Sequence, residues 1–328
     1  MNTIAITGTG SLIGQAIIKS INNSRFKKNK LIGMDYFNNT IGSYWVDANY
    51  ILPDILSDSV TEDMWLTRII QVIQENNISI LFIGVDFELR LFAKYKEHIE
   101  SLTLCIIVVS SKKTIEIADV KYLTYKFLKS NNFFHPKTFL KSEIKEAIKD
   151  EKIHFPMVIK PRNGYRSVDV YVVHNLEDLN KKIHIIERPI IQEFIGDNQT
   201  EYTCGVISFK NDIKCSIVLK RDLRDGNTSR TYLQHNFPKV IKDYIENVSA
   251  SLDQFGVCNF QLRVDNGIPK IFEINARHSG TTYIRAMYGF NEIEYLIEYF
   301  LNKNEIKFKI KEGIVQRYFD EFFVKHNK

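Results

Sequence analysis

The sequence predicts an α/β domain over residues 1–110, followed by an α+β region with largely antiparallel sheets over residues 111–328. Two observations support this division. Up to residue 110, short apolar strands alternate with amphipathic helices, which is typical of a parallel sheet covered on both faces. After residue 110 strands dominate, and several carry polar side chains at alternate positions. With 328 residues, of which 44% are hydrophobic, the chain can fill two or three domains.

The α/β domain is predicted from four apolar strands and three helices. The helices place apolar residues three or four positions apart, as Trp65, Ile69 and Ile73 illustrate. The strands are expected at 3–8, 30–35, 78–84 and 102–109, and the helices at 12–22, 62–76 and 87–99.

The α+β region begins with two helical segments at 113–131 and then becomes rich in strands. Further helices are expected at 143–151, 175–186, 238–254 and 280–300. Strands are expected at 155–161, 167–173, 188–195, 200–209, 212–221, 257–265 and 268–276. The aromatic segment 318–323 is interpreted as a stripe that covers the core.

Composition argues against several classes of protein. The chain has 44 Lys and Arg residues and 39 Asp and Glu residues, which gives a net charge of +5. The basic residues are spread along the chain without a long basic run, so we expect no nucleic-acid partner. The four cysteines form no Cys-x-x-Cys pair, which argues against a zinc site. No apolar stretch approaches the ~18 residues of a membrane span, and no leader pattern is present, so we expect a cytoplasmic protein without membrane partners.

A glycine-rich turn, with Gly8, Gly10 and Gly14, joins the first strand to the first helix. One interpretation is a turn that brings a helix N-terminus to a phosphate, and the other is a tight βα turn that binds nothing. Asp35 ends the second strand, where a ribose-binding acid would lie in a dinucleotide fold. The structural turn is favoured, because such turns occur wherever a doubly wound sheet begins.

Ser110, Tyr122 and Lys126 imitate the catalytic set of a short-chain dehydrogenase or epimerase. In those enzymes the lysine lowers the pKa of the tyrosine and the serine orients the substrate. An NAD(P)-dependent enzyme of this kind is the alternative function, and a nucleotide-binding module without catalysis is another. The polar strands after residue 150 favour a different chemistry.

Two successive strands near the C-terminal end carry oxygen ligands on one face. The "DNG" turn between them predicts a hairpin. If Asp265 pairs with Pro269, Gln261 lies opposite Glu273, and Asn275 follows on the same face. Carboxylate and amide oxygens suit Mg²⁺ that also binds phosphates.

Charged positions elsewhere complete a phosphate site. Lys160 ends an apolar strand, where an ammonium group needs an anionic partner or an exit to water. Arg277 follows the last predicted strand, where a guanidinium can grip phosphate oxygens. Glu201 comes just after a sharp turn and is placed to accept hydrogen bonds from ribose hydroxyls.

Taken in this order, the segments resemble ATP-grasp enzymes, and among them the carbamoyl-phosphate-synthase-like carboxylate–amine ligases. "TGTGSLIGQAIIKSI" and "VDFELRLFA" resemble a Rossmann-like pre-ATP-grasp domain, whose glycine turn does not hold NAD. The resemblance implies this domain at 1–110, an ATP-grasp small lobe that acts as a lid at 111–190, and a large lobe with the metal strands and a C-terminal tail at 191–328.

The resemblance also implies a set of site residues, carried by "ADVKYLTYK", "VIKP", "QEFIGDNQTEYT" and "FQLRVD…KIFEINAR". It places Lys121 and Lys160 at the phosphates, Glu193, Phe194 and Ile195 at adenine, Glu201 at the ribose, Gln261, Glu273 and Asn275 at the metal, and Arg277 with Lys160 as catalytic residues. Two departures are Val120 before Lys121 and a loop, 162–169, with one glycine and two arginines, Arg162 and Arg166.

The reaction implied by this resemblance is ATP-dependent ligation of a carboxylate to an amine through an acylphosphate, with release of ADP and phosphate. The implied cofactor is Mg²⁺, with Mn²⁺ as a substitute, and the implied partners are a small acid, a small amine and a second copy of the chain. For the acceptor pocket, Lys220, Arg221, Arg224 and Arg230 are candidates for binding a carboxylate, or form a solvated turn. His278 is interpreted as a helix-start contact rather than a base.

Overall fold

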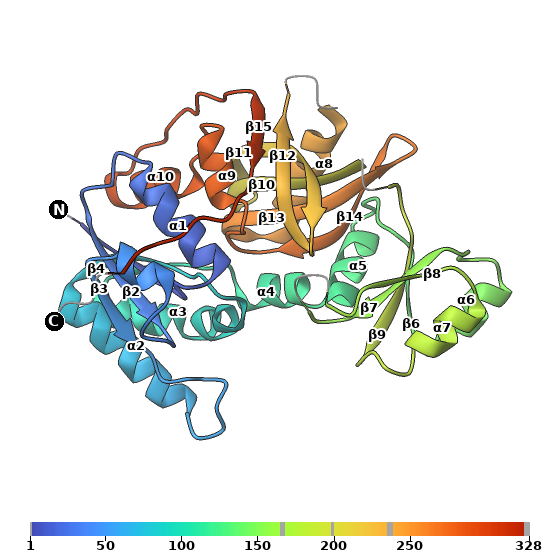
Figure 1. Ribbon diagram of the computed structural model, residues 1–328, viewed down its shortest axis with the longest axis horizontal. Coiled ribbons are helices and arrows are strands. Elements are labelled where there is room, and N and C mark those ends of the chain that lie inside the picture. Colours follow the sequence, from blue (N-terminus) through green and yellow to red (C-terminus); the bar gives the residue numbers. More distant parts are fainter. Residues whose placement is uncertain (1, 165–167, 198–199, 235–238, 325–328) are drawn as a thin grey trace. The chain divides into compact units, whose positions relative to one another are not determined.

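The computed structural model describes residues 2–164, 168–197, 200–234 and 239–324 (Figure 1). It divides into two compact units. The first comprises Met1–Lys112, Phe255–Val257 and Arg277–Lys328, and the second comprises Lys113–Gln254 and Cys258–Ala276. The predicted combination of a parallel α/β sheet with antiparallel sheets is confirmed. None of the helices in the described ranges has the length and apolar run that a bilayer requires.

The first unit is built on a five-stranded parallel sheet of order β3-β2-β1-β4-β5. Figure 1 shows α1, α9 and α10 on one side of this sheet and α2 and α3 on the other. The strands are β1 (Thr3–Thr7), β2 (Lys30–Asp35), β3 (Ala48–Ile51), β4 (Ile78–Phe82) and β5 (Ile106–Val108), with a further strand β15 (Gly313–Gln316). The helices are α1 (Leu12–Asn22), α2 (Glu62–Asn76), α3 (Leu89–Thr103), α9 (Thr282–Met287) and α10 (Glu292–Ile297), with short turns η1 (Ile41–Trp45), η2 (Asp86–Glu88) and η4 (Glu298–Asn302).

Local chemistry explains where these helices begin. The hydroxyl of Ser11 accepts a hydrogen bond from the Gly14 N–H at 2.8 Å and caps α1. Thr61 caps α2 in the same way through the Met64 N–H. β3 was not predicted, because its four residues are all only half-buried and show no apolar alternation.

Residues 277–328 group with the first unit, whereas the sequence analysis assigned them to the large lobe. The reason is packing: α9 and α10 contact α1, and the buried amide of Asn291 donates to the Ser20 carbonyl at 2.8 Å. The interpretation of segment 318–323 as a cover for the core is wrong, because Phe319 and Phe323 are 95% and 84% exposed.

The second unit contains two antiparallel sheets. Strands of the larger sheet run in the order β14-β13-β10-β11-β12, and the smaller sheet has the order β6-β9-β7-β8. The strands are β6 (Thr138–Leu140), β7 (Met157–Pro161), β8 (Tyr171–Val173), β9 (Pro189–Glu193), β10 (Glu201–Lys210), β11 (Asp212–Arg224), β12 (Asn227–Leu233), β13 (Gln254–Asp265) and β14 (Ile268–Asn275). The helices are α4 (Lys112–Asp119), α5 (Lys121–Ser130), α6 (Ile144–Lys149), α7 (Leu176–Lys182) and α8 (Lys239–Leu252).

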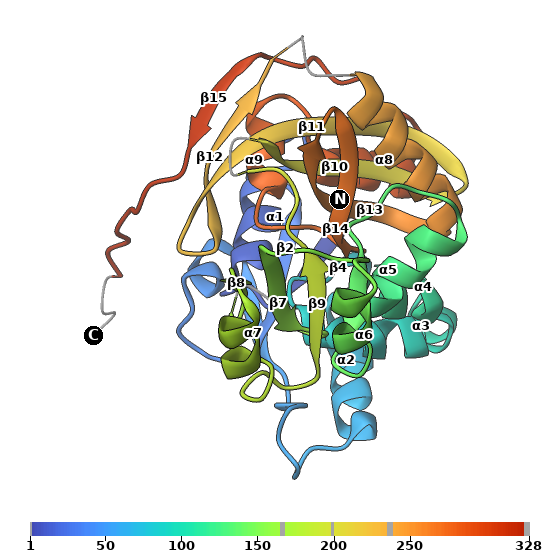
Figure 2. The same cartoon turned by 90° about the vertical axis from the view of Figure 1, so that its right-hand side faces the viewer.

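The smaller sheet has its own core. Figure 2 shows α6 and α7 against this sheet. Buried side chains from both helices and from β7 join in one cluster, which includes Ala147, Leu179, Met157 and Ile159. Lys160 lies on the opposite face of β7 from this core, and the core fixes the position of the strand.

The predicted pairing of the β13–β14 hairpin is confirmed at the site and wrong at the tip. Gln261 pairs with Glu273 as expected. At the tip, however, Asp265 pairs with Ile268 across a two-residue Asn-Gly turn, rather than with Pro269. A bulge at Phe272 adds one residue to β14 and restores the predicted register.

Candidate functional site

A cleft of about 190 Å³ lies in the second unit and is lined by residues from both of its sheets. Its walls include apolar side chains, among them Val158, Val172, Leu223 and Phe272. Its lining gathers most of the predicted site residues: Lys121, Lys160, Glu193, Phe194, Ile195, Glu201, Gln261 and Glu273. An apolar slot with a few convergent charges is typical of a site for a small, partly planar ligand.

Two buried lysines supply positive charge to this cleft. Lys160 is 5% exposed, and its Nζ donates to Gln192 Oε1 at 2.8 Å. Gln192 in turn donates to the Thr138 hydroxyl at 2.9 Å, which fixes its amide. Lys121 Nζ donates to the Gly164 carbonyl at 2.8 Å. Because these hydrogen bonds go to neutral oxygens, both amino groups remain able to pair with an anion in the cleft.

Burial changes the acidity of one of these groups. It lowers the pKa of Lys160 to about 7, and the neighbouring charge of Lys121 acts in the same direction. The opposite charge of Glu273 only partly offsets these effects. Lys160 is therefore poised to gain a proton when an anion enters the cleft.

The carboxylate of Glu201 is held by two arginines. Arg221 donates to Oε1 from Nε at 3.0 Å and from Nη2 at 2.6 Å. Arg263 approaches Oε2 from Nε and Nη2, each at 2.9 Å. Together these contacts occupy the roughly four acceptor positions of a carboxylate. The ribose contact predicted for Glu201 stays a prediction, and it requires one guanidinium to move away.

Gln261 is engaged in the same network. Its Oε1, the oxygen predicted to face the metal, accepts a hydrogen bond from Arg221 Nη2 at 2.7 Å. A dication at this oxygen would lie next to a guanidinium, which like-charge repulsion opposes. The geometry therefore weighs against Gln261 as a metal ligand.

Arg221 is a cleft residue that the sequence analysis left as a candidate for the acceptor pocket or a solvated turn. It is 7% exposed, whereas the Arg224 side chain is 79% exposed and lies 3.8 Å from Asp225. The available signal was strand alternation, because Arg221 shares a face of β11 with the fully buried Leu219. Arg166 of the predicted phosphate loop lies outside the described residues.

Glu273 and Asn275 are the remaining candidates for a metal site. Asn275 is absent from the described cleft lining, but its Nδ2 donates to Glu273 Oε1 at 3.2 Å. Within the described ranges, no cluster of three or more His, Cys, Asp or Glu side chains could hold a metal. Mg²⁺ often binds through one or two carboxylates together with substrate phosphates, and Glu273 with Asn275 fits that donor set.

The segment predicted to contact adenine, residues 193–195, is already engaged with other parts of the second unit. The Glu193 carboxylate accepts from the Lys137 N–H at 2.9 Å and lies 3.3 Å from Lys270 Nζ. The Ile195 carbonyl accepts from Arg263 Nη1 at 3.3 Å. Glu193 thus fixes the end of β9, and a contact of this segment with a base stays a prediction.

Arg277 belongs to the first compact unit. Its guanidinium pairs with Asp86, and its Nη1 donates to the His278 carbonyl at 2.8 Å. Asp86 comes from the "DFEL" segment on which the family resemblance partly rests. The role of Arg277 at the phosphates stays a prediction.

The glycine turn of the first unit is engaged internally. Asp35 accepts hydrogen bonds from the Gly10 N–H at 2.7 Å, the Thr9 hydroxyl at 2.8 Å and the Tyr36 N–H at 2.7 Å. Gly8 has a φ of +54°, and the path of the turn there suits glycine. The acid proposed for a ribose and the N–H proposed for a phosphate thus bond to each other, which favours the structural interpretation.

The dehydrogenase set is also not arranged for its chemistry. Ser110 is buried, and its hydroxyl accepts from the Phe255 N–H at 2.9 Å. Burial and then the charge of Glu143 raise the pKa of Tyr122, the opposite of what that catalysis needs. Lys126 Nζ lies 5.1 Å from the centroid of the Tyr122 ring.

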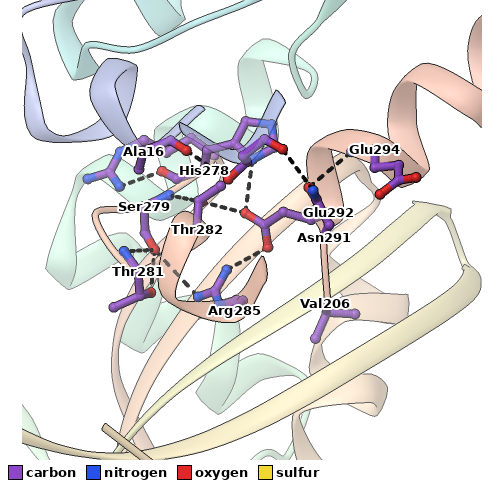
Figure 3. Close-up of polar contacts among 12 residues, drawn as sticks. Ala16, Val206, His278, Ser279, Thr281, Thr282, Arg285, Asn291, Glu292 and Glu294 are labelled. Atoms are coloured by element: carbon purple, nitrogen blue, oxygen red, sulfur yellow. Dashed lines mark hydrogen bonds and ion pairs between the residues drawn. The ribbon is translucent and has the colours of Figure 1, made fainter. Parts of the chain in front are cut away.

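A second buried polar network lies in the first unit, around Glu292 (Figure 3). Arg285 Nη1 donates to Glu292 Oε2 at 2.8 Å, His278 Nδ1 lies 3.0 Å from Oε1, and the Thr282 hydroxyl also donates to Oε1. Burial alone would raise the pKa of Glu292, but the charge of Arg285 and these contacts outweigh it and lower the pKa to about 2. His278 thus contacts a carboxylate in the first turn of α10, and its predicted role as a helix-start contact stays a prediction.

Replacing Arg285 with methionine should lower the free energy of unfolding by about 3–5 kcal/mol, because a buried carboxylate then loses its cation. Arg25→Met, which removes a 52% exposed partner of Glu294, should cost about 0–1 kcal/mol. Chemical unfolding monitored by circular dichroism measures both. Equal losses for the two variants would contradict this assignment.

The stabilisation by Glu292 also depends on pH. In the native chain the contribution of Glu292 to the free energy of unfolding is complete above its ordinary pKa of 4.5 and is lost as the pH falls through about 2.

Comparison with known proteins points to one family. Residues 189–322 match the family described as ATP-grasp in the biosynthetic pathway with Ter operon. D-alanine–D-alanine ligase A of Bacillus cereus is 30% identical over 139 residues, 38% of this chain and 45% of that one. The carbamoyl phosphate synthase large chain of Neisseria meningitidis serogroup B is 23% identical over 189 residues, 53% of this chain and 18% of that one. The matched segments thus cover less than half of either relative.

Solved structures share the fold across most of the chain. L-amino acid ligase from Bacillus licheniformis superposes with a TM-score of 0.70 at 17% identity, over 92% of this chain and 74% of that one. N5-carboxyaminoimidazole synthetase from Staphylococcus aureus, solved with ADP, gives 0.70 at 15% identity, over 96% and 80%. Residues 189–322 thus match an ATP-grasp family, and the chain shares the fold of these solved ligases.

Proposed function

We propose that the chain is an ATP-dependent ligase that joins a small carboxylic acid to an amine through an acylphosphate and releases ADP and phosphate. The observation that carries this proposal is the cleft of the second unit, in which buried Lys121 and Lys160 and the carboxylate of Glu273 line one pocket. The names of the relatives add support, since several are ligases that join an acid to an amine.

The proposed mechanism depends on positioning and charge. The apolar walls, including Val158 and Phe272, hold the base of ATP. Lys160 and Lys121 bind phosphate oxygens, whose negative charge spreads as the γ-phosphoryl group moves to the substrate carboxylate. The amine then attacks the acylphosphate carbonyl, the C–N bond forms, phosphate leaves with the C–O electron pair, and the nitrogen gives its extra proton to the departing phosphate. A protein side chain need not act as a nucleophile at any step.

Glu273 and Asn275 would hold Mg²⁺, which when bound neutralises phosphate oxygens and makes the γ-phosphorus more electrophilic. Gln192 keeps the Lys160 ammonium oriented within the cleft. The acylphosphate reacts readily with water, so the cleft has to exclude water while it exists.

The test is a screen of the full chain with Mg-ATP, amino acids and other small carboxylates, in which ADP and phosphate are measured separately from AMP and pyrophosphate. We expect ADP to form only when both an acid and an amine are present. AMP with pyrophosphate would contradict the acylphosphate route. ATP binding without turnover on any substrate pool would favour a non-catalytic module instead.

Nucleotide binding should take up protons above pH 7. In the free cleft the pKa of Lys160 is lowered to about 7, and a bound triphosphate raises it again. Binding is then unimpaired below pH 7 and weakens as the pH rises above it, by at most tenfold per pH unit. Titration calorimetry at pH 8 in buffers of different ionisation enthalpy should show uptake approaching one proton per nucleotide. No uptake in wild type, or the same uptake in Lys160→Met, would contradict this prediction.

A further inference from the structure

We propose that Arg221, positioned by Glu201, supplies the positive charge on the Gln261 side of the cleft, so that a nucleotide is bound there with one metal ion, on Glu273 and Asn275. This inference rests on the proposed function only in assuming that a triphosphate enters the cleft.

The placement of Arg221 follows from the strand order. β13, β10 and β11 are successive neighbours in the larger sheet. Arg221 of β11 reaches over β10, where it bonds to Glu201, to the amide of Gln261 on β13. Thr228 accepts a fourth hydrogen bond, from Nη1 at 3.3 Å. The guanidinium is thus fixed from three strands and is not a mobile surface group.

The charge balance indicates what this guanidinium is for. Arg221 and Arg263 both pair with the one carboxylate of Glu201, so Arg221 does not have this carboxylate to itself. Glu201 and Arg221 are 3% and 7% exposed, and a guanidinium at such depth that shares its carboxylate attracts an anion that binds beside it. The described contacts use four of the five guanidinium N–H donors, and the remaining Nη1 hydrogen is available to a phosphate oxygen.

The same guanidinium argues against a metal ion at Gln261. The 2.7 Å contact occupies the amide oxygen, and the positive charge beside it opposes a dication. Glu273 lies opposite Gln261 in the hairpin and has no such guanidinium contact among its described hydrogen bonds. The negative charge of the phosphates would therefore be neutralised by two groups. One is a single metal ion on Glu273 and Asn275, and the other is the guanidinium of Arg221 beside Gln261.

The experiment counts metal ions rather than turnover. Mn²⁺ bound to the full chain is titrated by electron paramagnetic resonance with a saturating non-hydrolysable ATP analogue. We expect one ion per chain in wild type and still one in Gln261→Glu, where the new carboxylate pairs with Arg221. The double variant Arg221→Met/Gln261→Glu should bind two ions. Two ions in wild type or in Gln261→Glu, or one in the double variant, would overturn the proposal.

Matched variants guard against unfolding and non-specific charge effects. Arg224→Met removes a guanidinium from the same strand at an exposed position and should leave the ion count at one. Arg221→Lys keeps the charge but loses the planar fork, and it should bind one ion with an analogue Kd raised about tenfold. If this Kd does not change, Arg221 does not face the phosphates and the proposal fails.

The count also separates this inference from the proposed ligase activity. One ion per chain without ligation of any acid and amine would refute the activity but not the inference. Two ions per chain in an active ligase would refute the inference alone.

Discussion

Replacing Glu273 with glutamine should reduce ADP release by about 10²-fold or more at saturating substrates, because the cleft loses the carboxylate proposed to hold Mg²⁺ beside the phosphates. Glutamine has nearly the same size and side-chain length as glutamate, and it can still form hydrogen bonds. The hairpin pairing of β13 and β14 should therefore survive. Measurement of ADP over a range of Mg²⁺ concentrations tests the expectation, since the apparent metal affinity should fall together with the rate.

A matched control lies on the neighbouring strand. Asp265→Asn makes the same carboxylate-to-amide change at the hairpin tip, where Asp265 lies 2.9 Å from Lys270 Nζ. This partly exposed pair should contribute about 0–1 kcal/mol to stability, and ADP release should stay unchanged. Equal activity of Glu273→Gln and Asp265→Asn would remove Glu273 from the metal site.

Replacing Lys160 with methionine should lower kcat/KM for ATP by about 10²–10³-fold, because a preorganised cation is lost from the phosphate site. The same change should leave the melting temperature of the free chain unchanged or higher. Methionine fills much of the same volume, and the cost of burying an ammonium group, which lowers the pKa of Lys160 to about 7, disappears.

These opposite directions for activity and stability make the prediction specific. A purely structural lysine would lose stability and activity together. Lys152→Met, at a side chain that is 57% exposed and lies 2.8 Å from Asp150, is the control, and it should change neither quantity measurably. Retention of normal ATP kinetics in Lys160→Met would contradict the proposed phosphate site.

The sequence predicted the general architecture because apolar periodicity reports which face of an element is buried. The pairing of Gln261 with Glu273 followed from such patterns, whereas the gathering of Lys160 and Glu193 around one cleft was implied by the family resemblance. Only the structure reveals how polar side chains bond to one another across strands. For this reason the clamp on Glu201 by Arg221 and Arg263 was missed, although alternation along β11 could have placed Arg221 on an inward face.

The position of residues 277–328 shows a second limit. The short helices α9 and α10 are buried over most of their residues, and their apolar residues do not show which sheet they will pack against. Buried polar contacts decide this, such as the hydrogen bond from Asn291 to the Ser20 carbonyl, which joins residues 271 positions apart. A sequence gives no local sign of such a long-range contact.

The bulge at Phe272 has a practical consequence. In a regular strand, adjacent residues face opposite sides, yet Phe272 and Glu273 both line the cleft. The hairpin residues that line the cleft thus lie away from its tip. Gly267 has a φ of +80°, which favours glycine, but the neighbouring Ile268 is 38% exposed and is a suitable attachment point for a fluorophore that reports on ligand entry without altering the pocket.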